Sequence, residues 1–205
     1  MTIKGLSEAV HQNAVNHGWW EEDRDFASLI ALVHSEWSEA LEEARAGRPL
    51  IYKLVASVTG LRMIQPADPQ YTRSDEKPEG VATELIDGCI RVLDVFGRYE
   101  VRVRDAESAK DATFESLYSD PSTTESVPED IPHLVAVLHA TTSQALVHSL
   151  VNDSEEGQLE SCELLTHTMV IALTWIKLHG IDPLQLLLEK HKYNITRPYK
   201  HGKKF

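Results

Sequence analysis

Apolar side chains recur every three to four residues along most of the chain, which is the periodicity of amphipathic α-helices. Strand-like alternation is confined to two ambiguous stretches, 50–58 and 99–104. Asp182 followed by Pro183 is a typical helix start, because a proline at the first helical position gives up no intrahelical hydrogen bond. The predicted helices are 6–17, 24–46, 79–98, 131–151, 156–179 and 182–195. We therefore expect an all-α fold, a helical bundle with a four-helix core.

Two segments lack this apolar periodicity and are expected to be loops. Residues 65–79 contain three prolines and many charged side chains. Residues 105–130 form a polar connector with little apolar content. We expect one domain over 1–205, in which this connector joins a first half, 1–104, to a second half, 131–205.

The two predicted halves resemble each other in sequence. Residues 29–41 align without gaps with 134–146, and residues 82–93 align with 161–172. Two amphipathic helices can resemble each other by chance, but the agreement favours a degenerate internal duplication. In the second copy, the acidic residues of the first copy are largely replaced, while Glu163 is kept at the position of Glu84. The replacements are Thr141 for Glu36, Gln144 for Glu39 and Thr166 for Asp87.

Composition narrows the class of protein. Acidic residues outnumber basic ones by 32 to 20, for a net charge of −12, and such a surface repels nucleic acids. The two cysteines, Cys89 and Cys162, lie in apolar helical segments, so we expect buried free thiols rather than a disulfide framework. No secretory signal is visible, and no apolar run approaches the ~18 residues of a membrane span. These features predict a cytoplasmic protein that binds neither membrane nor nucleic acid.

Two pairs of acidic residues lie at helical spacing in two long predicted helices. Glu36 and Glu39 are three residues apart in the second helix, and Glu84 and Asp87 are three apart in the third. Residues i and i+3 are neighbours on a helix surface, so each pair presents two carboxylates from one face.

Burial decides what these carboxylates can do. Most helical carboxylates are solvated, and we expect this of Glu42 and Glu43. Glu36 and Glu84, in contrast, each interrupt a stripe of apolar residues at helical spacing. Burying several carboxylates together costs many kcal/mol unless a proton or a cation compensates. We therefore predict a site for a hard divalent ion, Mg²⁺ or Mn²⁺, between two helices.

Basic residues gather near the end of the chain, in 189–205. A solvated tail is one interpretation and suits 202–205. The other is an anion-binding arm, because Lys190 and Arg197 beside a bound metal ion would hold phosphate oxygens.

A histidine and two tryptophans lie near the start of the chain. Trp19 and Trp20 follow a predicted helix stop and could simply cap a small core. Alternatively, an indole could stack on a nucleobase while His11 hydrogen-bonds to its edge. The spacing does not separate these two interpretations.

Together these motifs resemble the all-α nucleoside triphosphate pyrophosphohydrolases, the superfamily of MazG, dimeric dUTPase and dCTP pyrophosphatase. The family's ExxE and ExxD metal signatures correspond to Glu36-Trp-Ser-Glu39 and Glu84-Leu-Ile-Asp87, and HQNAVNHGWWEE and KYNITRPYKHGKK are similar to further family segments. In MazG-like proteins the Lys/Asn tail closely follows the ExxD helix, whereas about half of this chain intervenes.

The resemblance implies a fold and an activity. A nucleoside triphosphate and water would give the monophosphate and pyrophosphate, in control of the nucleotide pool or removal of unwanted nucleotides, and a homodimer is compatible with the family. The implied Mg²⁺ ligands are Glu36, Glu39, Glu84 and Asp87, with Glu39, beside Glu36, acting on the attacking water. The implied substrate-binding residues are His11 and Trp20 for the base and Lys190, Asn194 and Arg197 for sugar and phosphates.

Two further classes of function remain open at this point. One is a non-catalytic nucleotide-binding or regulatory protein on the same scaffold, and the other is a purely structural helical partner. The latter leaves the acidic residues on apolar stripes unexplained. The motifs do not define the base, which could be a canonical or a modified pyrimidine.

Overall fold

The computed structural model describes residues 1–56, 62–66, 77–99, 113–120, 127–152 and 154–202. Six α-helices dominate this part of the chain, so the predicted helical class is confirmed. Every predicted helix is present, with ends that differ by at most three residues. The helices are α1 (Ile3–Asn16), α2 (Phe26–Arg45), α3 (Val81–Arg98), α4 (Ile131–Val151), α5 (Glu155–Leu178) and α6 (Pro183–Ile195).

Side-chain caps fix where most of these helices begin. In five of them a Thr, Asp or Ser oxygen just before the first turn accepts a backbone N–H that would otherwise have no partner. α1 begins earlier than the predicted residue 6, because the Thr2 hydroxyl accepts the Gly5 N–H at 3.1 Å. The capping residues are Thr2, Asp25, Asp130, Ser154 and Asp182.

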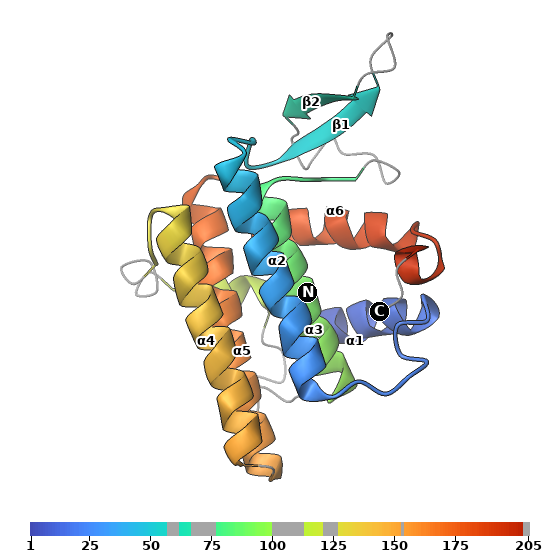
Figure 1. Ribbon diagram of the computed structural model, residues 1–205, viewed down its shortest axis with the longest axis vertical. Coiled ribbons are helices and arrows are strands. Elements are labelled where there is room, and N and C mark those ends of the chain that lie inside the picture. The colour runs from blue at the N-terminus through green and yellow to red at the C-terminus, as the bar shows by residue number, and fades with distance from the viewer. Residues whose placement is uncertain (57–61, 67–76, 100–112, 121–126, 153, 203–205) are drawn as a thin grey trace.

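A β-hairpin connects α2 to α3 (Figure 1). It consists of β1 (Tyr52–Ala56) and β2 (Arg62–Pro66), paired antiparallel. The ambiguous stretch 50–58 thus contains a strand, and the start of the predicted loop 65–79 belongs to a second strand that the sequence analysis missed. Of the stretch 99–104, all but Tyr99 lies outside the described residues.

Part of the connector, which was predicted to be a polar loop, is helical and buried. A short 3₁₀ helix, η3 (Phe114–Tyr118), lies in its centre, and Phe114 is fully buried while Tyr118 is nearly so. The backbone N–H of Phe114 donates to the Met1 carbonyl at 2.9 Å, which ties the connector to the start of the chain. Residues 105–112 and 121–126 of the connector lie outside the described residues.

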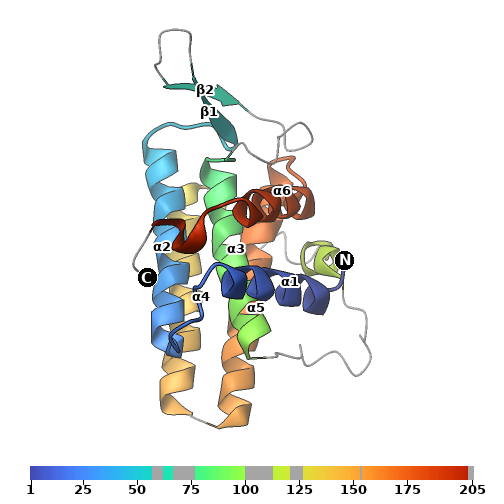
Figure 2. The same cartoon turned by 90° about the vertical axis from the view of Figure 1, so that its right-hand side faces the viewer.

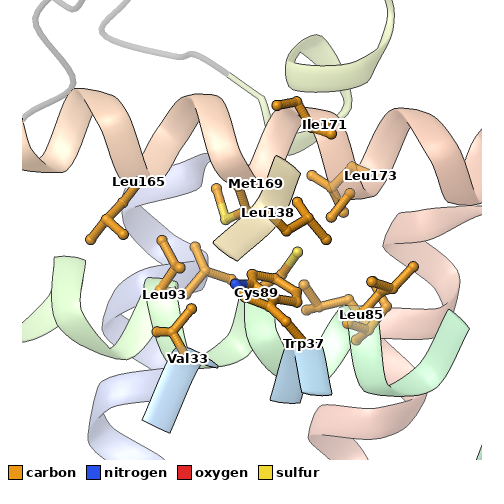
Figure 3. Packing of buried hydrophobic residues seen from close by; sticks show 14 of the residues in the cluster. Val33, Trp37, Leu85, Cys89, Leu93, Leu138, Leu165, Met169, Ile171 and Leu173 are labelled. Carbon is orange, nitrogen blue, oxygen red and sulfur yellow. The ribbon is translucent and has the colours of Figure 1, made fainter. Parts of the chain in front are cut away.

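The long helices lie side by side, with α2 against α3, α4 against α5, and α2 against α4 (Figures 1 and 2). α1 and α6 run across the outer side of α3 (Figure 2). Figure 3 shows apolar side chains from four helices meeting in the core, which also contains Cys89. Both cysteines are buried and unbridged, as predicted.

Helices α2 and α4 contact each other through residues that are 105 positions apart in the chain. This is the offset that aligns residues 29–41 with residues 134–146. The Nδ1 atoms of His34 and His139 are 2.7 Å apart. Ser38 Oγ lies 3.4 Å from His139 Nε2, and Ser143 Oγ lies 3.5 Å from His34 Nε2. Each contact therefore occurs twice with the halves exchanged, as in an interface with two-fold symmetry.

α4 differs from the expectation that no segment is long and apolar enough to cross a membrane. By length and composition alone this helix qualifies, with a mean hydropathy of 1.4 over its best window. A single such helix is weak evidence, because core helices pass the same test, and 28% of the window is buried in the fold.

Candidate functional site

The candidate site lies between α2 and α3, where the two helices approach closely. Gly88 makes this approach possible: a Cβ at this position would lie 2.1 Å from the ring of Trp37. Trp37 is fully buried, and its Nε1 donates to Thr142 Oγ1 of α4 at 3.0 Å. The missing side chain on α3 therefore lets the indole of α2 fill the space between the helices and sets their separation.

Three of the four predicted metal ligands converge at this position. Glu36, Glu39 and Glu84 each offer a carboxylate oxygen, and these oxygens lie within 4.8 Å of one another. Glu36 and Glu84 are buried, whereas Glu39 is exposed. The arrangement is thus a carboxylate cluster with a closed and an open side, which is the donor set that a hard divalent ion prefers.

Two of these carboxylates resist ionisation. Burial, and then the nearby Asp87 carboxylate, raises the pKa of Glu84 from 4.5 to about 8. Burial also raises the pKa of Glu36, although Arg91 beside it acts in the opposite direction. A bound cation would favour the ionised form of these two carboxylates and offset the cost of burying their charge.

The fourth predicted ligand, Asp87, pairs with a buried lysine. Lys190 Nζ lies 2.7 Å from Asp87 Oδ2 and donates to the Pro78 carbonyl at 3.3 Å. The lysine side chain is 1% exposed, yet its pKa is raised, because Asp87 and Glu84 outweigh the effect of burial. The structure thus brings Lys190 to the carboxylate cluster from a segment about 100 residues away in the chain.

Arg91 is a residue of this site that the sequence analysis missed. Its Nε donates to Glu36 Oε1 at 2.9 Å. A signal was present, because positions 84, 87, 91 and 94 follow the helical repeat and form one polar face of α3. The sequence analysis recognised only the first two members of this face, Glu84 and Asp87.

His11 and Trp20 do lie together, and they meet on a third residue, Asp94, which was also missed. His11 Nδ1 lies 2.7 Å from Asp94 Oδ1, and Trp20 Nε1 donates to the same oxygen at 3.0 Å. The two rings are edge to face with centroids 5.1 Å apart, and the Arg98 guanidinium lies 5.5 Å from the Trp20 ring. This half-buried polar cluster forms around Asp94, the last residue of the polar face of α3 that also contains Glu84, Asp87 and Arg91.

Among the described residues, no hydrogen bond or ion pair joins the side chains of Asn194 and Arg197 to the carboxylate cluster. Asn194 lies on α6 one turn after Lys190, and its Oδ1 is buried without a hydrogen-bond partner among the described residues. The Arg197 backbone carbonyl lies 2.9 Å from His17 Nε2, and its guanidinium makes no ion pair within the described part of the chain. Lys200 pairs with Glu21 at 3.1 Å, so this part of the basic segment rests near α1.

One expectation about solvated carboxylates is wrong in part. Glu42 is exposed and pairs with Arg45, as expected. Glu43 is instead half-buried beside Tyr52 of β1, and burial together with this carboxylate raises the pKa of Tyr52 to about 12. The hairpin therefore contacts the end of α2, which the helical pattern could not show.

No family model, curated protein or solved structure matches the chain. The resemblance to all-α pyrophosphohydrolases consequently stays a prediction. The features that bear on function are a carboxylate cluster, a buried lysine and a polar aromatic cluster along one helix.

Proposed function

We propose that the chain is a Mg²⁺-dependent nucleoside triphosphate pyrophosphohydrolase that converts a nucleoside triphosphate and water into the monophosphate and pyrophosphate. The observation that carries this proposal is the approach of the Glu36, Glu39 and Glu84 oxygens to within 4.8 Å of one another. The predicted motifs ExxE and ExxD gain support from this convergence, because Glu39 and Glu84 are 45 residues apart in the sequence. We further propose a cytoplasmic role in control of the nucleotide pool.

The residues present fit a hard divalent ion. Glu36, Glu39 and Glu84 would hold it with Asp87 beside them, and such an ion would favour the ionised form of Glu84, whose pKa is raised to about 8 by burial and then by Asp87. When bound, Mg²⁺ would supply charge neutralisation for phosphate oxygens and for an attacking water. Mn²⁺ has the same preference for oxygen ligands and could replace it.

The side chains of the chain have distinct tasks in this proposal. Glu39 is the exposed carboxylate of the cluster, so we assign it to orient or deprotonate the attacking water. Glu36, held by Arg91, supports that position. Lys190 keeps a positive charge beside the carboxylates and would contact phosphate oxygens, with Arg197 as a further cation.

The polar cluster at the other end of α3 suits the nucleoside. Asp87 and Asp94 are seven residues apart, a rise of about 10 Å along the helix, so phosphates and base could bind along one face. Trp20 would stack on the base and His11 would hydrogen-bond to its edge, while Asp94 orients both. Asn194, one turn after Lys190 on α6, would contact the sugar.

We also propose that a degenerate internal duplication produced the core. The reciprocal contacts of His34 with Ser143 and of His139 with Ser38 support it, because they relate positions that align in sequence. On this view α2, α3, α4 and α5 form the four-helix core of a fused pair, and only the first pair keeps the acids.

Pyrophosphate release from a panel of dNTPs and NTPs tests the proposed activity. With Mg²⁺ we expect equal amounts of monophosphate and pyrophosphate from a small set of nucleotides, and no release with EDTA. The Glu39→Gln variant is the matched control for contaminating activity. Release of orthophosphate alone, or equal rates in wild type and variant, would overturn the proposal.

A second candidate function is nucleotide binding without hydrolysis. It is favoured by the Arg91–Glu36 and Lys190–Asp87 ion pairs, which neutralise two of the four carboxylates without a metal ion. Equilibrium dialysis with radiolabelled dNTPs separates the two. Retention of intact triphosphate in the presence of Mg²⁺, with no pyrophosphate formed, would establish the binding protein.

A further inference from the structure

Arg91 has unused hydrogen-bond donors in the middle of the polar face of α3. Its Nε donates to Glu36 Oε1 at 2.9 Å, and its side chain makes no other hydrogen bond among the described residues. A guanidinium has five N–H donors, so four of them remain on the two terminal nitrogens. The side chain is 31% exposed, and a ligand can therefore reach these donors.

The aspartates on either side of Arg91 bind other partners. Asp87, four residues earlier, pairs with Lys190 at 2.7 Å. Asp94, three residues later, is held by the aromatic cluster at 2.7 and 3.0 Å. Within the described part of the chain, Glu36 is the one carboxylate that forms an ion pair with Arg91. The terminal nitrogens of Arg91 are thus left for an acceptor from outside the chain.

A second arginine, Arg24, lies near the C-terminal half of α3. The segment between α1 and α2 comes close to this half of the helix (Figure 2), where Asp23 pairs with Arg98 at 3.1 Å. The Arg24 guanidinium lies 5.3 Å from the Trp19 ring and forms no ion pair with the described residues. Burial lowers the pKa of Arg24, and the nearby positive charge of Arg91 lowers it further.

These two arginines form a positively charged position in a chain whose net charge is −12. Two neighbouring guanidiniums repel each other, and an anion bound to both would offset that repulsion. A phosphate suits such a position, because its oxygens accept several N–H donors at once from planar guanidinium groups.

The position of Arg91 along α3 indicates which phosphate it would contact. Arg91 lies about 6 Å along the helix axis from Asp87 and about 4.5 Å from Asp94. In the binding mode proposed above, the base lies near Asp94 and the terminal phosphates lie near the carboxylate cluster. The phosphate attached to the nucleoside then lies beside Arg91.

We propose that Arg24 and Arg91 bind the phosphate group attached to the nucleoside, so that the site also binds nucleoside monophosphates. Glu36 holds Arg91 through Nε and leaves its terminal nitrogens for the phosphate. This inference rests on the proposed function for the place of the base, but it requires neither Mg²⁺ nor turnover. A nucleoside monophosphate should therefore bind in the presence of EDTA.

Calorimetric titration in EDTA with dUMP, dCMP, dTMP, dAMP and dGMP tests this inference. Wild type should bind at least one of them, at least about tenfold more tightly than the nucleoside with the same base. Arg24→Gln should weaken binding of that monophosphate about tenfold and leave binding of the nucleoside unchanged. Arg45→Gln removes the same charge from an exposed arginine paired with Glu42 and is the matched control.

Arg91→Lys is the second variant, because Arg91→Gln would leave the buried Glu36 carboxylate without its partner. The lysine keeps the charge but loses the planar fork, so monophosphate binding should again weaken, while circular dichroism checks that the variant is folded. Equal monophosphate binding by wild type and Arg24→Gln would overturn the inference. So would an equal loss of nucleoside and monophosphate binding in that variant, or no binding of any monophosphate by wild type.

Failure of this inference can be told apart from failure of the proposed activity. Monophosphate binding that depends on Arg24, without pyrophosphate release from any triphosphate, would support the phosphate site and overturn the hydrolysis. Pyrophosphate release that depends on Glu39, with unchanged monophosphate binding in Arg24→Gln, would support the hydrolysis and overturn the phosphate site.

Discussion

The α2–α3 and α4–α5 pairs are built alike but carry different chemistry. Both are antiparallel pairs of long helices, and α2 meets α4 through reciprocal contacts of His34 and His139. Between α2 and α3, carboxylates at positions 36, 39 and 84 gather, those of Glu36 and Glu84 buried and that of Glu39 exposed. In the second pair, Thr141 and Thr166 align with positions 36 and 87 and bond to their own helices, whereas Gln144 and Glu163 align with positions 39 and 84. The two pairs thus pack in a similar way, but only the first pair has acids at all four of these positions.

The largest expected effect is on turnover, and it concerns the first pair alone. Glu39→Gln or Asp87→Asn should lower pyrophosphate release about a thousandfold, because each removes a charge needed for metal binding or for the attacking water. Helicity measured by circular dichroism should not change. Glu42→Gln, one turn further along α2 and exposed, is the matched control. Normal turnover in either test variant would remove the basis for the assigned site.

The next effect concerns how closely the helices of each pair approach. Gly88→Ala should destabilise the fold by about 1–3 kcal/mol, because the new Cβ would overlap the buried Trp37 ring. His167 aligns with Gly88 in the second pair, and His167→Ala, exposed, should change stability by less than about 0.5 kcal/mol. Thermal melting in EDTA measures both. A Gly88→Ala protein as stable as wild type would show that close approach does not determine the site.

A smaller effect is expected at the nucleoside end of α3. Asp94→Asn removes the charge that His11 and Trp20 share, so the KM for the nucleotide should rise about tenfold, the effect of about 1.4 kcal/mol, while kcat changes little. Asp23→Asn, which alters an exposed carboxylate paired with Arg98, serves as the control. A fall in kcat with unchanged KM would argue against a role in base binding.

The smallest effect concerns pH. The folded protein keeps the Glu84 proton up to about pH 8, whereas the unfolded chain releases it near 4.5. Because the folded state binds more protons between these values, its stability in EDTA should fall as pH rises from about 4.5 to about 8. Mg²⁺, which needs the carboxylate, should restore more stability at the upper end.

Two variants test whether Glu84, in the first half of the chain, causes this dependence of stability on pH. Glu84→Gln should flatten the dependence of the melting temperature on pH, since the titrating group is gone. Glu163→Gln, at the aligned and exposed position of α5, should leave it unchanged. An unaltered slope in Glu84→Gln would mean that another group causes it.

The helices could be predicted because their signals are local. Apolar periodicity and capping residues such as Asp25 and Asp182 act within a few residues of the bond they make, and the observed ends follow them closely. The β-hairpin was harder, because β2 is short and lies beside a proline-rich segment. The burial of Phe114 in the polar connector was also missed, because a single aromatic residue produces no periodic pattern.

The sequence by itself determined the helical class, the spacing of the acidic pairs and the residues that interrupt apolar stripes. Only the tertiary structure decided which charges meet. Lys190 pairs with Asp87, Arg91 with Glu36, and Asp94 joins His11 to Trp20, each through contacts between separate helices or segments. The physical reason is that a helix surface is set by a local repeat, whereas the partner of a buried charge depends on how whole helices pack.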